Sequence, residues 1–233
     1  MKVDVQTMRN AVTLAATQYP EVSVRPGSGG WDMVVLSPDH TTMVQMTVHK
    51  DAFTDYEVWD EFAFDTGDML EALSTAKDGV DIDISTGRLV MRSDGMTYRR
   101  RILVPEEKRP RIPSLDLSTH VVTPVDRLLQ LISKGEKKHG RVVMSTDIVS
   151  FCAAVEDEQG LGVTLEIPAD ECGVLEGGAR SQYSVGSWAA YLKAIPKGTM
   201  LDITYDTDYP LVSRYSVGNL DTMWMIAPYI ERD

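Results

Sequence analysis

The sequence predicts an α+β protein built from two similar halves, each with antiparallel sheets and helices on one face. Three observations predict this class: strand-like segments outnumber helical ones by more than three to one, short turns join them as hairpins, and the order of elements repeats after about 120 residues. The chain has 233 residues, of which 43% are hydrophobic and 25% charged. These values exclude disordered, collagen and coiled-coil classes and leave room for one large domain or two small ones.

Four segments carry apolar residues at the i, i+3, i+4, i+7 spacing of helices that bury one face. Their apolar sets are Met8, Ala11, Val12 and Ala15; Met69, Leu70, Leu73 and Ala76; Val125, Leu128, Leu129 and Ile132; and Trp188, Tyr191, Leu192 and Ile195. We expect a helix of about 10 to 13 residues around each set. Thr123 is a candidate N-cap of the third helix with Pro124 at its first position, and Pro196 ends the fourth helix because its ring cannot continue one.

Most of the remaining chain is rich in Val, Ile, Thr and Tyr, a composition typical of strands. The expected strands are Glu21–Arg25, Met33–Ser37, Thr42–His49, Val58–Phe64, Val80–Ser85, Arg88–Arg92, Thr97–Val104, Val142–Thr146, Val149–Val155, Gly162–Ile167, Gln182–Val185, Met200–Tyr205, Leu211–Val217 and Met223–Ala227. Turn residues separate them, for example at 28–30, 93–95 and 218–219, so we expect antiparallel hairpins.

The segment 106–119 shows neither a strand nor a helix pattern, and it contains a run of charges and two prolines. We therefore expect an N-terminal domain of residues 1–105, an extended connector of residues 106–119 and a C-terminal domain of residues 120–233. In both halves a helix that ends near Lys77 or Lys197 precedes a glycine and a series of strands joined by turns. This similarity predicts a duplicated domain.

No set of residues has the spacing of a known catalytic or metal site. The four histidines, His40, His49, His120 and His139, are isolated. Acidic clusters at 78–83 and 156–158 could hold a divalent cation, but strand alternation explains the first and a hairpin tip the second. We expect no metal, no cofactor and no enzymatic activity. The alternative is a hydrolase that uses Asp81 and Asp83 with a divalent ion.

Positive charge gathers on helices of an otherwise acidic chain. The formal net charge is −12, from 23 Lys and Arg against 35 Asp and Glu, which argues against a uniformly basic nucleic-acid-binding protein. The cations opposite the apolar sets are Arg9, Arg127, Lys134, Lys138 and Lys193, with Lys77 and Lys197 just after two of the helices. The second helix is the exception because it carries Glu71. Such a strip suits sequence-independent contact with a phosphate backbone; ordinary solvated helix surface is the alternative.

Several short motifs in the right order resemble the proliferating cell nuclear antigen family, the DNA sliding clamps of archaea and eukaryotes. They are Met225-Ile-Ala-Pro-Tyr-Ile230, Leu36-Ser-Pro-Asp-His-Thr-Thr-Met-Val44 followed by Phe53 and Tyr56, the segment 110–117, and Asp208-Tyr-Pro-Leu211. The resemblance covers essentially the whole chain. Thr41 stands where the family usually has valine and Met225 where it usually has an aromatic residue. The acidic composition suits a member from a halophile or one encoded by a virus.

The resemblance implies the DNA clamp fold and a ring of three subunits that encircles double-stranded DNA. Such a processivity factor tethers DNA polymerase, flap nuclease, ligase and the clamp loader through a short peptide motif. It implies a homotrimer; the alternative is one subunit of a heterotrimer, or a clamp-like protein that sequesters partners without closing a ring. No apolar stretch approaches the ~20 residues that cross a bilayer, so we expect a cytoplasmic, nucleoid-associated protein, or one in the host cytoplasm if a virus encodes it.

The resemblance also implies the positions of three sites. The DNA-binding ring lining would comprise Arg9, Lys77, Arg127, Lys134, Lys137, Lys138, Lys193 and Lys197. The partner-peptide pocket beneath the connector would comprise Leu36, His40, Met43, Ile112, Pro113, Pro210, Met225, Ala227, Pro228 and Ile230. The edge strands Thr97–Val104 and Ala179–Val185 would join subunits through Tyr98, Arg99, Arg101, Leu103, Ser181, Tyr183 and Val185, with the arginines in ion pairs across the joint.

Overall fold

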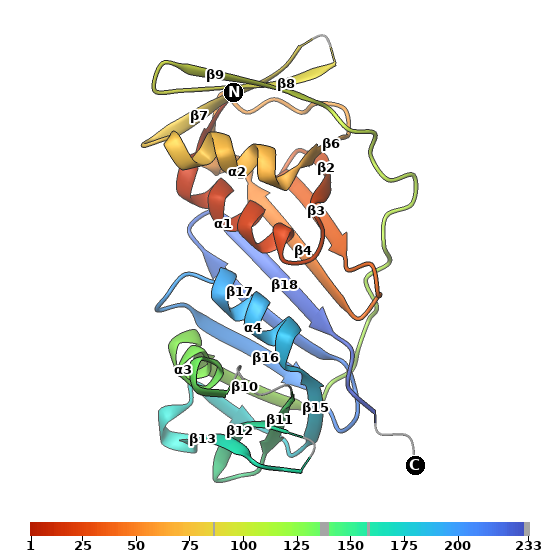
Figure 1. Cartoon of the computed structure of the whole chain (residues 1–233), viewed down its shortest axis with the longest axis vertical. Helices are drawn as coiled ribbons and strands as arrows, with labels where there is room; N and C mark the ends of the chain where they lie inside the picture. The colour runs from red at the N-terminus through yellow and green to blue at the C-terminus, as the bar shows by residue number, and fades with distance from the viewer. Residues whose placement is uncertain (86, 136–139, 158, 231–233) are drawn as a thin grey trace. The chain divides into compact units, whose positions relative to one another are not determined.

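The computed structural model describes residues 1–85, 87–135, 140–157 and 159–230 (Figure 1). Two compact units make up the chain: Met1–Arg111 with Ser216–Thr222, and Ile112–Tyr215 with the segment from Met223 onward. The change of unit at Arg111 falls inside the predicted connector, whereas the boundaries at 105 and 119 stay a prediction. The described residues form eighteen strands and four α-helices, so the predicted excess of strands over helices is confirmed.

The first unit contains two sets of antiparallel strands and two helices. Its elements are β1 (Lys2–Asp4), α1 (Val5–Ala16), β2 (Glu21–Gly27), β3 (Gly30–Leu36), β4 (Thr42–His49), β5 (Phe53–Thr54), β6 (Phe62–Asp65), α2 (Thr66–Thr75), β7 (Gly79–Ser85), β8 (Arg88–Ser93) and β9 (Met96–Arg101). The strand orders are β5-β1-β7-β8-β9 and β4-β3-β2-β6. Helices α1 and α2 pack against each other, and α2 also packs against β8 (Figure 1).

The second unit repeats this plan. Its elements are β10 (Thr119–Pro124), α3 (Val125–Gly135), β11 (Arg141–Thr146), β12 (Ser150–Glu156), β13 (Gly162–Pro168), β14 (Val174–Glu176), β15 (Arg180–Ser184), α4 (Val185–Ala194), β16 (Met200–Tyr205), and most of β17 (Leu211–Val217) and β18 (Leu220–Ile226). The strand orders are β13-β12-β11-β15 and β14-β10-β16-β17-β18. Helix α3 packs against α4 and against β12 and β13 (Figure 1).

All four predicted helices are confirmed as α1 to α4. Most residues of each predicted apolar set are buried, as the spacing predicts. Three helices begin with a side-chain cap that satisfies a free N–H of the first turn: Asp4 accepts from Thr7 N, Asp65 from Asp68 N, and Ser184 from Ser187 N. Helix α4 ends at Ala194, and Ile195 is extended because Pro196 disfavours helical backbone in the residue before it.

The predicted N-cap of the third helix is wrong. Pro124 is the last residue of β10, and α3 begins at Val125. Thr123 is fully buried in the strand, and its Oγ1 has no hydrogen-bond partner among the described residues. The N–H of Val125 instead donates to the carbonyl of Thr199 at 2.9 Å. A neighbouring turn therefore satisfies the start of this helix.

The predicted strand Val58–Phe64 is shorter in the structure, where β6 begins at Phe62. The preceding residues have no strand partner. Their aromatic rings instead pack around buried Trp31: the centroid of Trp59 lies 6.1 Å from that of Trp31, and Tyr56 lies 5.2 Å from Phe53. Packing of aromatic rings onto this core replaces the strand ladder in residues 55–61.

Candidate functional site

A groove lies between the connector and the face of the strands β16, β17 and β18 in the second unit. Connector residues 112–117 form one wall, and side chains of the three strands form the floor. The groove holds about 520 Å³ of accessible space. Cross-strand partners share a face of a sheet, and Thr204 is the partner of Val212, so both side chains belong to the floor.

The floor of this groove is mainly apolar. Val212 and Met225 are 1% and 7% exposed, so the connector and the neighbouring side chains cover most of their surface. Ile112 in the connector remains 37% exposed. Arg214 and Asp116 add one charge of each sign. An apolar floor with an exposed apolar rim and few charges is typical of a surface that binds a peptide.

Three of the ten predicted pocket residues line this groove: Ile112, Pro113 and Met225. Four others belong to the same unit but are not among its lining residues: Pro210, Ala227, Pro228 and Ile230. The remaining three, Leu36, His40 and Met43, belong to the first unit, where Leu36 and Met43 are cross-strand partners beside the β3–β4 turn. The predicted pocket as a whole therefore stays a prediction.

Sequence reasoning missed several residues of the groove: Leu115, Leu117, Thr204, Val212, Arg214 and Met223. A signal for them exists in the alternation of the last strands. Leu211, Ser213 and Tyr215 are buried on one face of β17, which places Val212 and Arg214 on the other face. Met223 and Met225 share a face of β18 for the same reason. An argument from strand period would have found the strand residues but not the connector wall.

The β3–β4 turn that carries His40 is organised by Asp39. The Asp39 carboxylate accepts from Ser37 Oγ at 2.6 Å, Thr41 Oγ1 at 2.8 Å and Thr41 N at 3.2 Å. These hydrogen bonds, with that of Ser37 the strongest cause, lower the pKa of Asp39 below its ordinary value of 3.8. His40 adopts the left-handed conformation with φ of 59°. Thr41 thus supplies a hydroxyl that a valine at this position lacks.

We expect this turn to be stable above pH 3.8 and to loosen only as the pH falls through the lowered pKa of Asp39, because a depressed carboxyl pKa stabilises the structure in which the group is ionised. The Thr41 amide signal in an NMR titration should report a midpoint below 3.8. Thr41→Val removes one donor and should move the midpoint up towards 3.8. An unchanged midpoint in Thr41→Val contradicts the assigned hydrogen bond.

The helices carry fewer free cations than the sequence suggests, because two arginines have structural partners. Arg9 on α1 donates from Nη2 to the carbonyl of Leu73 at 2.6 Å, near the end of α2. Arg127 on α3 forms an ion pair with Glu171 at 3.1 Å. Both side chains are half-buried, and each offers less charge to a ligand than its sequence position implies.

The predicted lysines lie on the surface. Lys134 on α3 and Lys193 on α4 are exposed, as are Lys77 and Lys197 in the turns after α2 and α4. Lys137 and Lys138 fall outside the residues that the structure describes. Since α3 and α4 pack side by side, Lys134 and Lys193 belong to one helix pair of the second unit.

Helix α2, the exception in the sequence, has its acidic residues neutralised by Arg100 of β9. Arg100 Nε donates to Asp68 Oδ1 at 2.7 Å, and its Nη2 donates to Glu71 Oε2 at 2.6 Å. Hydrogen bonding to Glu71 is the main cause that raises the pKa of Arg100. Arg100 lies on the predicted edge strand Thr97–Val104, but its side chain serves its own unit.

The two predicted edge strands lie at the ends of their sheets: β9 ends the five-stranded sheet and β15 ends the four-stranded one. On β9, Arg99 and Arg101 are exposed. On β15 the predicted contact residues are wrong, because Ser181, Tyr183 and Val185 are 1%, 0% and 8% exposed and face the interior of their own unit.

The outer edge of β15 is also partly occupied. The carbonyl of Gln182 accepts from Tyr229 N at 2.7 Å, and Arg180 N donates to Thr207 Oγ1 at 3.3 Å. These bonds show that the even-numbered residues of β15 direct their backbone N–H and C=O groups towards the open edge of the sheet. Two of these groups already form hydrogen bonds to other segments of the same unit. The prediction instead assigned the edge contacts to the odd-numbered residues of this strand.

Strand β13, at the other end of the same sheet, presents a more accessible edge. Asp157 N donates to the carbonyl of Leu161 at 3.0 Å, which fixes the register of the β12–β13 hairpin. Odd-numbered residues of β13 therefore bond to β12, and the outward backbone groups belong to Gly162, Thr164 and Glu166. Among the described residues, none forms a hydrogen bond to these three outward groups.

The described residues contain no group of three or more His, Cys, Asp or Glu side chains arranged to hold a metal ion. Two histidines instead lie beside single carboxylates: His49 Nε2 is 2.7 Å from Asp221 Oδ2, and His120 Nε2 is 3.3 Å from Asp202 Oδ1. Cys152 and Cys172 are free thiols and are half-buried.

No protein-family model matches the chain. The DNA polymerase sliding clamp of Methanothrix thermoacetophila is 25% identical over 240 residues, covering 99% of this chain and 98% of that protein. The sliding clamp of Natronomonas pharaonis is 24% identical over 243 residues with the same coverage. Similarity thus runs from end to end at the level of the whole sequence.

Solved structures agree with this similarity. PCNA of A. fulgidus, solved with the C-terminal region of FEN-1, has a TM-score of 0.91 at 19% identity and covers 100% of this chain and 99% of its own. The chain is thus a homologue of archaeal DNA polymerase sliding clamps and has their fold. PCNA of Thermococcus kodakaraensis has a TM-score of 0.88 at 17% identity, covering 98% of this chain and 99% of its own. The predicted α+β class with the DNA clamp fold is confirmed.

Proposed function

We propose that this chain is a sliding clamp, a processivity factor that forms a ring of three copies around duplex DNA and has no catalytic activity. The observation that carries the proposal is the repeated plan of the two units, each of which packs a pair of helices side by side, combined with end-to-end similarity to sliding clamps. None of the described helices is long and apolar enough to cross a membrane. The site of action that we propose is the nucleoid.

DNA contact in this proposal is electrostatic and independent of sequence. Lys134, Lys193 and Lys197 supply exposed cations, and Arg100 removes the repulsion that Asp68 and Glu71 would exert on phosphates. A few screened charges favour weak, mobile contact over tight binding. Such contact suits a ring held on DNA by closure.

The helix cations are tested by the variant Lys134→Glu, Lys193→Glu, Lys197→Glu. We expect processive DNA synthesis with a cognate polymerase and loader to fall about tenfold, because reversed charges repel the phosphate backbone. The matched control is Lys50→Glu, Lys108→Glu, Arg111→Glu, which makes the same charge change at exposed positions outside the four α-helices. Equal product lengths for both variants would refute the helix faces as the DNA contact.

We propose that β9 of one copy pairs with β13 of the next. Both strands end their sheets and direct the backbone groups of alternate residues outward, which permits strand addition. The outward residues of β9 include Arg99 and Arg101, and those of β13 include Glu166, so opposite charges meet across the joint. A basic edge and an acidic edge on one chain give a head-to-tail contact, which closes into a ring.

This complementarity within a single chain favours a homotrimer over a heterotrimer. A heterotrimer remains the second candidate, since a PCNA2–PCNA3 complex of Sulfolobus tokodaii, with a TM-score of 0.84 at 16% identity, is built on the same fold. The mass of the purified chain in solution separates the two. A trimer of this chain alone supports the homotrimer, whereas a trimer seen only after mixing with a paralogue supports the heterotrimer.

The groove beneath residues 112–117 is our proposed docking site for partner peptides. Its apolar floor suits a short segment with a few large apolar side chains. The related clamp of A. fulgidus was solved with the C-terminal region of FEN-1. We extend this to flap nuclease, DNA polymerase, ligase and the clamp loader as partners of this chain.

A further inference from the structure

The outer face of the five-stranded sheet in the first unit gathers positive charge. Cross-strand partners lie on the same face of a sheet, so the printed registers place the side chains row by row. Lys2, Asp81, Arg92 and Thr97 form one row, and Ser85, Arg88 and Arg101 form another. The cations of this face, all exposed, are Lys2, Arg88, Arg92, Arg99 and Arg101; we call them the arginine face.

The fold compensates these charges only in part, because Asp81 lies opposite Lys2 and Arg92 whereas no carboxylate lies opposite the other three cations. Arg88 lies directly opposite Arg101, and like charges in this position destabilise a pair of strands. Among the described residues, no carboxylate lies within ion-pair distance of any of the four arginines. Arg100, on the opposite face of β9, is by contrast held by two carboxylates. An arrangement that costs stability and has no internal partner indicates an external one.

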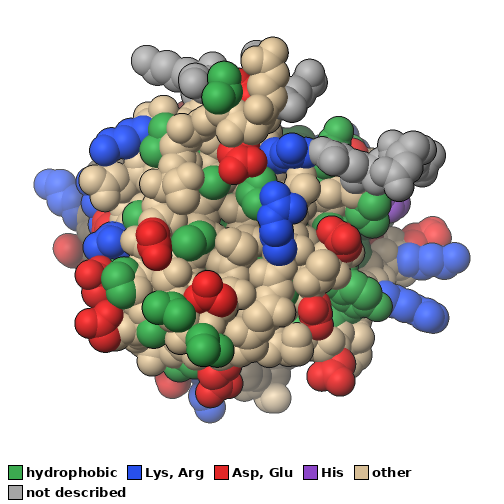
Figure 2. Space-filling model, turned by 90° about the horizontal axis from the view of Figure 1, so that it is seen from below, with side chains coloured by type: hydrophobic (Ala, Val, Ile, Leu, Met, Phe, Trp, Pro, Cys, Tyr) green, Lys and Arg blue, Asp and Glu red, His purple; other side chains and the backbone are tan. Residues whose placement is uncertain are grey.

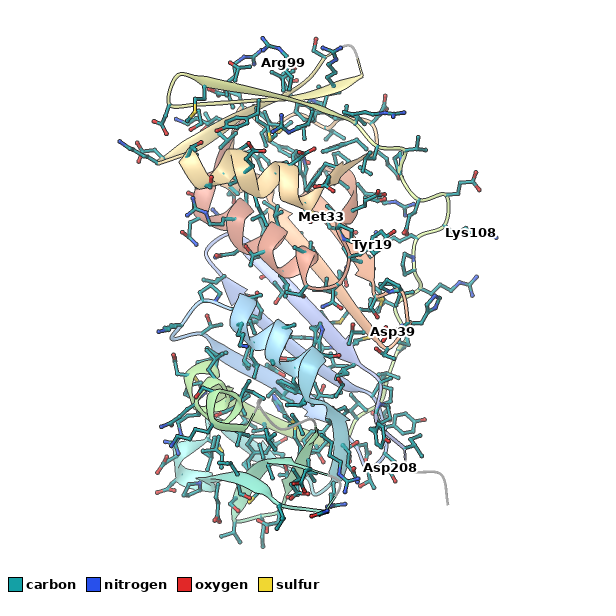
Figure 3. The ribbon with its side chains drawn as sticks, viewed as in Figure 1. Tyr19, Met33, Asp39, Arg99, Lys108 and Asp208 are labelled. Atoms are coloured by element: carbon teal, nitrogen blue, oxygen red, sulfur yellow. The ribbon has the colours of Figure 1, made fainter. Side chains whose placement is uncertain are left out.

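The arginine side chains are spread over the sheet. Val90 lies between Arg88 and Arg92 on β8 and opposite Arg99, yet only 6% of it is exposed. The aliphatic stems of the arginines account for this cover, since long cationic side chains bury their stems and keep their charged ends in water. Figure 3 shows Arg99 on the side of the sheet away from α2. The guanidinium groups are therefore available for contact.

Another face of the chain shows no such concentration of one charge. Figure 2 shows basic, acidic and apolar side chains interspersed on a face of the second unit. The arginine face holds five of the 23 Lys and Arg of a chain with net charge −12. This local excess sets the sheet face apart as a site for an anion.

We propose that the arginine face docks an acidic polypeptide segment of a partner protein. Guanidinium groups bind carboxylates through paired hydrogen bonds, and alternate residues of an extended segment repeat at the same interval as the arginines of a strand. Asp81 and Asp83 share the face, where they repel a continuous polyphosphate but accept basic residues of a peptide. The described residues of the face include no aromatic ring on which a base could stack.

The arginine face shares Arg99 and Arg101 with the proposed ring joint, but its other cations lie away from the edge strand. Arg88 and Arg92 lie on β8, one strand inside the edge strand β9. Variants at these two positions therefore change the arginine face without changing the edge. Loss of acidic-peptide binding with an intact trimer is specific to the face, whereas loss of the trimer would point to the joint.

The test measures binding of a fluorescent peptide of alternating Glu and Ser by anisotropy at low salt. We expect wild-type protein to bind it, and Arg88→Glu with Arg92→Glu to weaken binding about tenfold. The control Lys50→Glu with Lys108→Glu makes the same charge change at other exposed positions and should bind as wild type does. If charge reversal impairs folding, Arg88→Gln with Arg92→Gln is measured in its place, because glutamine removes the charge and keeps the surface polar.

Three results would overturn the proposal. The first is no binding of the acidic peptide to wild-type protein, and the second is an equal loss in the control variant, which would indicate general charge attraction. The third is tighter binding of a single-stranded oligonucleotide of matched length and charge that depends on Arg88 and Arg92, which would assign the face to phosphates. Preference for the acidic peptide supports the proposal.

Discussion

Reversal of two charges on β9, in the variant Arg99→Glu with Arg101→Glu, is expected to convert the proposed ring into monomers. Both arginines belong to the outward residues of an edge strand, and the outward residues of β13 include Glu166. The variant places like charges across the joint, where they oppose pairing of the two strands. We expect the dissociation constant of the trimer to rise at least about a hundredfold at low salt. Sedimentation over a range of protein concentrations measures it.

Two further variants make this result specific. Glu166→Arg alone should also weaken the ring, and adding it to the β9 double variant should restore much of the affinity because the charges become complementary again. Arg88→Glu with Arg92→Glu, one strand inside the edge, should leave the mass unchanged. A trimer that survives reversal of both Arg99 and Arg101 at low salt would contradict pairing of β9 with β13.

The sequence predicted the helices well because their signal is local. Each helix buries one face, and apolar spacing within a dozen residues reports that face directly. The expected strand Leu211–Val217 was also located correctly, since turn residues bound it on both sides. Strands β1 and β10 were missed: β1 has only three residues, and β10 begins at Thr119, the last residue of the predicted connector.

The candidate sites were harder to predict because they depend on register. One residue of displacement exchanges the two faces of a strand, and Tyr183 of β15, expected at a subunit joint, lies on the buried face. The role of Arg100 depends on its lying across from α2, a contact between residues about 30 positions apart that no local pattern reports. The blocked edge of β15 likewise depends on Tyr229, far along the chain.

Truncation of the groove, in the variant Ile112→Ala with Met225→Ala, is expected to weaken binding of a partner peptide by about tenfold to a hundredfold. Ile112 forms part of the connector wall and Met225 part of the floor, so the variant removes apolar contacts from both sides of the groove. Full burial of one large apolar side chain contributes about 1.5–3 kcal/mol, and about 1.4 kcal/mol corresponds to a factor of ten in affinity. Calorimetry with a synthetic peptide from the C-terminal region of A. fulgidus FEN-1 measures the effect.

The matched control for this variant is Ile148→Ala. Ile148 is an aliphatic residue that is 92% exposed at the turn between β11 and β12, outside the groove. It should leave peptide affinity unchanged, and both variants should keep the mass of the wild-type ring. Because Met225 is 7% exposed, circular dichroism must show that the groove variant is folded before its affinity is compared. A folded variant with wild-type affinity would remove the groove as the docking site and leave the residues around Pro210 and Pro228 as the surface to test.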